Sequence, residues 1–172
     1  TPLEDHRDVR LIDISDTEVQ DISPLAKFQK LEVLKADRSK IEKLDPLFGI
    51  KTLKQVYVDR TTLHDITAQE FLERNPQVLL VYKTIHLARW WANLPDGWKE
   101  VFQNEIGTDT TREELHRLVE KEAIHFKDAH VRDLSVFGEF VRLKELHFSG
   151  TGITEIPNLE NLRSLKSLHA TS

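Results

Sequence analysis

Hydrophobic residues recur along this chain in a pattern that begins again about every 22 residues. Residues 31–53 show it most clearly, and the same spacing is visible before and after this segment. Its apolar positions are Leu31, Leu34, Ala36, Ile41, Leu44, Leu47, Ile50 and, at the next start, Leu53. Each copy opens with apolar residues at alternate positions, which is typical of a short strand. We therefore expect strands at 11–15, 33–37, 55–59 and 79–83, and further copies that contain Ile124, Leu146 and Leu168.

Fixed-period repetition of this length, headed by L-x-x-L-x-L, is the sequence pattern of a leucine-rich repeat. The predicted fold class is α/β: a leucine-rich repeat solenoid with a curved parallel sheet and a convex side of short 3₁₀ helices or turns. Each repeat buries its apolar residues only by stacking on its neighbours. Ser23–Leu25 and Asp45–Leu47, which each contain Pro-Leu, are expected to form the 3₁₀ turns.

A small polar residue follows several predicted strands, at a place where such repeats usually have asparagine. Thr17, Ser39, Thr61 and Thr151 occupy it. Serine and threonine hydroxyls can bond to nearby backbone groups. We expect these side chains to stabilise the turn that ends each strand.

From Thr84 the spacing of apolar residues changes to three and four, which predicts helices. Asn93-Leu94-Pro95 separates two of them, Gly107 is expected to end the second, and Thr111 with Glu114 has the spacing of a capping box for a third. The predicted organisation is a first repeat array at 1–83, an all-helical insert or cap at 84–120, and a second array at 121–172. This last array stops just after a strand, so we expect it to be truncated.

All three tryptophans lie in the helical segment: Trp90, Trp91 and Trp98. They could form an aromatic binding platform, or the core of a helical cap that covers the end of an array. Their helical spacing favours the core. Because Trp90 and Trp91 are adjacent, at least one should point partly outward, and this pair is a candidate binding patch.

Side chains between the inward leucines should point to the concave face of the sheet, because side chains alternate along a strand. Charged and aromatic residues in or just after the strands make a mixed surface that suits a protein partner. The candidate binding residues are Lys35, Arg38, Tyr57, Arg60, His125, His147 and His169. The alternative for each of them is an ordinary solvated strand face.

Three of these candidates, His125, His147 and His169, form one column on neighbouring strands. Imidazoles spaced by about 4.8 Å could share a zinc, copper or nickel ion, or form a patch that protonates near pH 6. A straight column converges poorly on one point, and Glu145 is the only carboxylate on these strands that points the same way. We therefore expect ordinary surface histidines and predict no metal site and no cofactor.

Composition and the absence of known catalytic motifs argue against several classes of function. A net charge of −5 lacks the basic character of nucleic-acid binders, and no apolar run is long enough to span a bilayer. There is no cysteine, no phosphate loop, no His-Glu-x-x-His motif and no nucleophile elbow. We expect no catalytic residues, no enzyme activity, and neither nucleic acid nor membrane as a partner. No motif indicates the compartment or the oligomeric state.

The arrays resemble the short, 22-residue leucine-rich repeats of protein-interaction domains, especially bacterial ones. Residues 148–156, which include Thr151 at the asparagine place, carry this resemblance. Residues 90–99 and 110–115 are similar to the helical segment that precedes arrays in some bacterial proteins of this type. The resemblance implies a non-catalytic module that binds a protein through its concave face. The alternative is a structural or regulatory docking segment of a larger multidomain protein.

Overall fold

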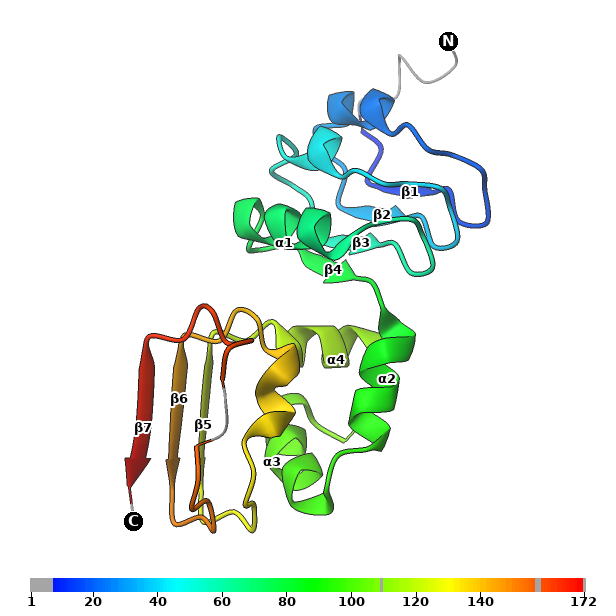
Figure 1. The fold of residues 1–172 in the computed structure, drawn as a ribbon. Coiled ribbons are helices and arrows are strands. Elements are labelled where there is room, and N and C mark those ends of the chain that lie inside the picture. The colour runs from blue at the N-terminus through cyan, green and yellow to red at the C-terminus, as the bar shows by residue number, and fades with distance from the viewer. Residues whose placement is uncertain (1–7, 109, 157–158, 172) are drawn as a thin grey trace. The chain divides into compact units, whose positions relative to one another are not determined.

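The computed structural model describes residues 8–108, 110–156 and 159–171, and these divide into two compact units (Figure 1). The first unit ends at Thr84 and the second begins at Ile85. Each has its own parallel sheet and its own buried cluster. The mixed α/β content and the parallel strands agree with the predicted fold class. Among the described helices, none has the length and apolar character that crossing a membrane would require.

The first unit contains a four-stranded parallel sheet in the order β1-β2-β3-β4. Its strands are β1 (Leu11–Asp13), β2 (Val33–Lys35), β3 (Gln55–Tyr57) and β4 (Leu79–Val81). Leu11 pairs with Val33, Val33 with Gln55 and Gln55 with Leu79. The register therefore follows the repeat in the sequence. Each strand begins where the periodicity predicted, and each ends two residues earlier.

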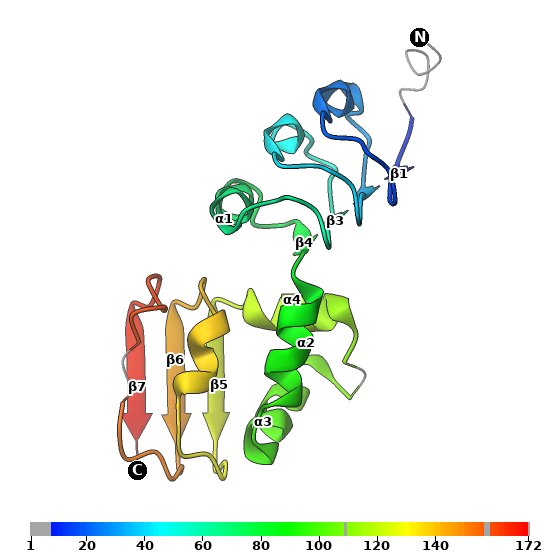
Figure 2. The same ribbon diagram turned by 45° about the vertical axis from the view of Figure 1, so that its right-hand side comes forward.

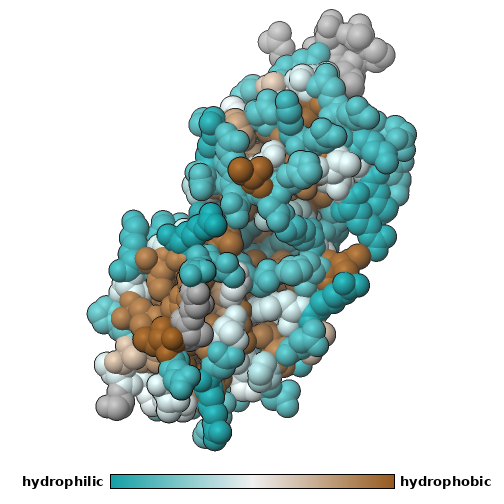
Figure 3. Space-filling view, viewed as in Figure 1, coloured by the Kyte–Doolittle hydropathy of each residue, from teal (hydrophilic) through white to brown (hydrophobic). Residues whose placement is uncertain are grey.

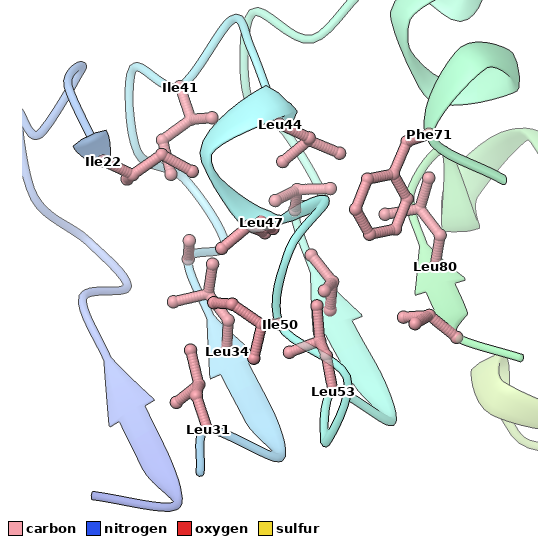
Figure 4. Packing of buried hydrophobic residues seen from close by; sticks show 14 of the residues in the cluster. Ile22, Leu31, Leu34, Ile41, Leu44, Leu47, Ile50, Leu53, Phe71 and Leu80 are labelled. Atoms are coloured by element: carbon pink, nitrogen blue, oxygen red, sulfur yellow. The ribbon is translucent and has the colours of Figure 1, made fainter. Parts of the chain in front are cut away.

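Short helices lead the chain from each strand to the next and pack on the core side of the sheet. They are η1 (Ser23–Lys27), η2 (Asp45–Leu47) and α1 (Asp65–Arg74). The predicted 3₁₀ turns at Ser23 and Asp45 are confirmed, with proline in the first turn of both. Apolar residues from strands and returns form a layered core between them, as Figure 4 shows for Leu34, Leu47 and Phe71. All three have no exposed surface, which is the packing expected of stacked repeats.

Three of the four predicted polar turn residues share the same local bond to the backbone, and the fourth, Thr151, instead accepts from the Ile153 N–H at 3.5 Å. Hydroxyls of Thr17, Ser39 and Thr61 donate to the backbone oxygen three residues earlier, at 2.7, 2.7 and 2.9 Å. Beside them, Asp16, Arg38 and Arg60 adopt positive φ, as do Lys83, Asp128 and Gly150. This left-handed residue recurs at the repeat distance. The sequence did not reveal it, because aspartate, arginine, lysine and glycine share no side-chain type.

Three helices follow the first sheet: α2 (Thr84–Ala92), α3 (Asp96–Ile106) and α4 (Arg112–Val119). All but the first residue of α2 belongs to the second unit, as do α3 and α4. The predicted stop at Gly107 is confirmed, because this residue adopts φ 83° and its N–H donates to the Gln103 oxygen at 2.7 Å. Both bonds of the Thr111–Glu114 capping box are also present. Pro95 is the N-cap of α3, so Asn93-Leu94-Pro95 separates α2 from α3 as predicted.

The second sheet is parallel and three-stranded, and the views in Figures 1 and 2 place α2, α3 and α4 beyond β5, at the end of the sheet opposite β7. Its strands are β5 (Ala123–Lys127), β6 (Glu145–Ser149) and β7 (Ser167–Thr171), and η3 (Ser135–Glu139) follows β5. Helices and sheet share one core. In it the Trp98 ring packs edge-on against Phe126 and Phe137, with centroids 5.1 and 5.2 Å apart.

Candidate functional site

The outer face of the second sheet, meaning the side of β5–β7 that faces away from the core, carries the predicted histidine column. His125 pairs with His147 and His147 with His169 across the parallel strands. Their neighbours in sequence, such as Ile124 and Leu146, are buried on the opposite side, so strand alternation fixes the direction of the imidazoles. The structure therefore brings these three candidate residues together.

The imidazoles of this column are in contact with one another. The His125 and His147 rings stack with centroids 4.5 Å apart, and the His147 and His169 rings meet edge to face at 4.4 Å. His147 Nε2 lies 3.4 Å from the Ser167 hydroxyl. His125 and His169 are exposed and His147 is half-buried.

Next to the column lies the Glu145 side chain, which is exposed and belongs to the start of β6. Ligand atoms of His125, Glu145 and His147 all lie within 4.8 Å of one another. The histidines also border a shallow depression of about 540 Å³ that extends to Lys127, Ser149 and Thr171. The outer face thus offers imidazole, carboxylate, hydroxyl and ammonium groups within a small area.

On the first sheet, the corresponding outer face becomes less accessible from β1 to β4. Asp13 is exposed and Lys35 is half-buried. Tyr57, however, is only 7% exposed and packs with Leu79 and Val81. Its hydroxyl lies 3.3 Å from Gln55 Oε1. Tyr57 is thus in the predicted column, but most of its surface is covered.

The two arginine candidates occupy equivalent turns, one repeat apart. Arg38 and Arg60 are both exposed and both have positive φ, 58° and 56°. Arg38 forms a two-pronged ion pair with Asp16 of the preceding repeat, and the guanidinium lowers the pKa of this aspartate. Asp37, which precedes Arg38, accepts a bond from the Asp59 N–H at 2.9 Å. Side-chain hydrogen bonds thus link the turn of one repeat to the equivalent turn of the next.

Trp90 and Trp91, the predicted insert patch, are both half-buried and both pack against the core of the second unit. The Trp90 indole N–H donates to the Val136 oxygen at 3.0 Å, and its ring lies 5.7 Å from that of Phe102. Trp98 is 1% exposed. The structure gives these tryptophans a packing role, and only part of the adjacent pair reaches the surface.

Sequence reasoning missed one titratable group, Glu120. It follows α4 directly, and its Oε1 is buried with no hydrogen-bond partner among the described residues. Burial raises the pKa of Glu120 to about 8, and the charge of Arg142 lowers it only in part. No motif surrounds this residue, so only the packing of the helix end reveals it.

No protein-family model and no curated protein sequence matches the chain. Among solved structures it is similar to internalin InlF of Listeria monocytogenes, with 18% identity, a TM-score of 0.42, and coverage of 99% of this chain and 44% of that one. It is also similar to internalin C2 of the same species, with 19% identity, a TM-score of 0.42, and coverage of 99% of this chain and 65% of that one. For the functional domain of InlJ, also from this species, the identity is 17%, the TM-score is 0.33, and the match covers 92% of this chain and 29% of that one.

The chain thus spans less than two thirds of the length of each of these internalins. At such identities and TM-scores, the similarity does not define a partner or an activity for it. The class of protein follows from the chain itself, since parallel strands one repeat apart stack their apolar residues into layers. The fold is leucine-rich-repeat-like.

Proposed function

We propose that this protein is a non-catalytic recognition module that binds a protein partner through the outer faces of its two repeat arrays, residues 1–83 and 121–172. These are the faces that would be concave in a leucine-rich repeat solenoid. The observation that carries the proposal is the outer face of the second sheet. There His125, Glu145, His147 and His169 form a continuous, accessible surface on rigid strands.

The chemistry of this surface favours a protein over a polyanion. In the second unit His125 and His147 lie close to Glu145, and Lys127 lies at the other end of the β5–β6 ladder, beside Ser149. In the first unit Lys35 lies beside Asp13. Surfaces with charges of both signs and with aromatic groups match the mixed chemistry of another protein. The net charge of −5 opposes binding along a phosphate backbone.

Charge reversal tests this proposal on the intact chain. Arg60→Glu and Lys127→Glu each change one exposed cation next to an outer face. Lys27→Glu is the matched control, because Lys27 is an exposed cation at the end of η1, on the return side of its repeat. Partners are captured from lysate and surface fractions of the source cell with wild type and each variant, and binding of the captured protein is then measured with purified components.

We expect a partner whose affinity falls at least about tenfold in Arg60→Glu or Lys127→Glu, the effect of one well-placed contact, and stays unchanged in Lys27→Glu. Circular dichroism of all variants should match wild type. Equal binding by all three variants would contradict recognition through these faces. It would favour instead the tryptophan pair or a docking role within a larger protein.

A further inference from the structure

The second sheet offers more than a surface of mixed charge. We propose that His125, Glu145 and His147 form a binding site for Zn²⁺ or a similar borderline transition-metal ion. In the described part of the chain, these residues are the one group of three metal-ligating side chains whose ligand atoms approach one another closely, all within 4.8 Å. Nothing in the predicted protein-binding function requires this convergence.

The register of the sheet creates the site. His125 and His147 are direct partners on β5 and β6, and Glu145 lies two residues before His147 on the same face of β6. The three ligands therefore come from two adjacent, hydrogen-bonded strands, and their Cα positions are fixed by the ladder. Glu145 lies off the line of the histidine column, so the ligands form a triangle rather than a straight row.

The distances suit a small cation after a modest side-chain movement. Zinc binds histidine nitrogen at about 2.0–2.1 Å and carboxylate oxygen at about 2.0–2.2 Å, which places tetrahedral ligands about 3.4 Å apart. The observed limit of 4.8 Å requires the groups to close by little more than an ångström. His125 and Glu145 are exposed and His147 is half-buried, so rotation about their side-chain torsions can supply that movement.

The donor set selects the ion. Two imidazoles and one carboxylate are ligands that zinc, copper and nickel prefer, whereas Mg²⁺ and Ca²⁺ require mostly oxygen. Three protein ligands leave a fourth position of a tetrahedral ion open to water or to an incoming group. The Glu145 carboxylate also neutralises one of the two charges of the ion. The Ser167 hydroxyl, 3.4 Å from His147 Nε2, is placed to orient that imidazole.

His169 distinguishes the proposed site from a simple row of three histidine ligands. Its ring touches that of His147, yet it lies on β7, on the side of β6 away from His125. The straight row of histidines alone would make His169 equivalent to His125. The proposed site includes Glu145 and excludes His169, so the two arrangements predict different variants.

Calorimetric titration of the full chain, without any polyhistidine tag, with Zn²⁺ tests the site. We expect one ion per chain. His147→Ala and Glu145→Gln should each lower the affinity at least about tenfold, while His169→Ala and His86→Ala leave it within about twofold. His86 is the matched control, since it is an exposed histidine 2.9 Å from a carboxylate, that of Glu139, in the same unit. Mg²⁺ at the same concentration should give no heat of binding.

Visible absorption of bound Co²⁺ gives a second readout, because its d–d bands report the ligand geometry. A Co²⁺ spectrum that wild type and His169→Ala share, and that Glu145→Gln loses, supports the site. Zinc binding that His86→Ala or His169→Ala removes, or that Glu145→Gln leaves unchanged, would overturn it, as would no binding at all. The titration contains no partner protein, so its failure would leave the proposed recognition function standing.

Discussion

At the scale of single residues, the most unusual group is the Glu120 carboxyl. One of its oxygens is buried without a partner among the described residues, and burial raises its pKa to about 8 from an ordinary value near 4.5. An acid with a raised pKa stays protonated in the folded chain while the unfolded chain ionises. Folding stability therefore falls as the pH rises from about 4.5 to 8 and levels off above that range.

Glu120→Gln removes this pH dependence, because the amide has nearly the same shape and carries no ionisable proton. We expect the variant to resemble wild type at pH 4.5 and to be more stable by about 1–3 kcal/mol at pH 8.5, because each pH unit by which a pKa is raised corresponds to about 1.4 kcal/mol and part of the effect is lost to solvent screening. Urea unfolding at both pH values measures it. Glu100→Gln, at an exposed position of α3, is the control. An equal difference from wild type at both pH values would refute this account.

At the scale of elements, helix α3 lies against the turn after β5 through a glycine. A Cβ on Gly97 would stand 2.6 Å from the backbone oxygen of His130, and a backbone atom cannot move aside as a flexible side chain can. Alanine is a better helix former than glycine by about 1 kcal/mol. At this contact the steric cost of about 1–3 kcal/mol should exceed that gain.

Gly97→Ala is therefore expected to lower the free energy of unfolding by up to about 2 kcal/mol, the steric cost less the gain in helix propensity. Gly138→Ala is the control from the same unit, since its nearest neighbour would be the Asn161 side chain at 3.8 Å. It should change stability by less than about 0.5 kcal/mol, as substitutions without such contacts do. Thermal and urea unfolding of both variants decide the matter, and a Gly97→Ala protein as stable as wild type would disprove the close contact.

These elements also show which features a sequence can predict. Strand positions follow from the 22-residue period, and the helix ends at Gly107 and Thr111 follow from local backbone chemistry. The full extent of helix α1, Asp65–Arg74, is harder to predict from the spacing of apolar residues. Its first residues carry no strong apolar spacing, and their helical state depends on packing by Phe71 and Leu72 against the core.

The candidate site was predictable in part for the same reason. Strand alternation placed His125, His147 and His169 on one face, and the register confirms this. Tyr57 obeys the same rule, yet Leu79 and Val81 pack with it, since burial on an outer face depends on neighbours in space. The proximity of Glu145 to two imidazoles depends on side-chain torsions, which no spacing in the sequence specifies.

At the scale of the whole molecule, each of the two units encloses its own apolar cluster. One cluster contains Leu34 with the returns of the first sheet, and the other joins Leu146 to helices α3 and α4. On the face that Figure 3 shows, the first unit is largely hydrophilic, whereas the second has a broader apolar area. Ion pairs such as Arg38–Asp16 connect successive repeats, but they are exposed and contribute little to stability. The cores must therefore supply most of it.

Because each unit has its own core, a cavity made in one core should destabilise that unit and leave the other unchanged. Leu34→Ala and Leu146→Ala each remove a fully buried side chain, and each should cost about 2–5 kcal/mol in its own unit. Hydrogen exchange followed by mass spectrometry should show faster exchange at 8–84 in the first variant and at 85–171 in the second. Each variant serves as the control for the other. Faster exchange throughout the chain in either variant would show that the two units unfold as one, as neighbouring repeats of a continuous solenoid do.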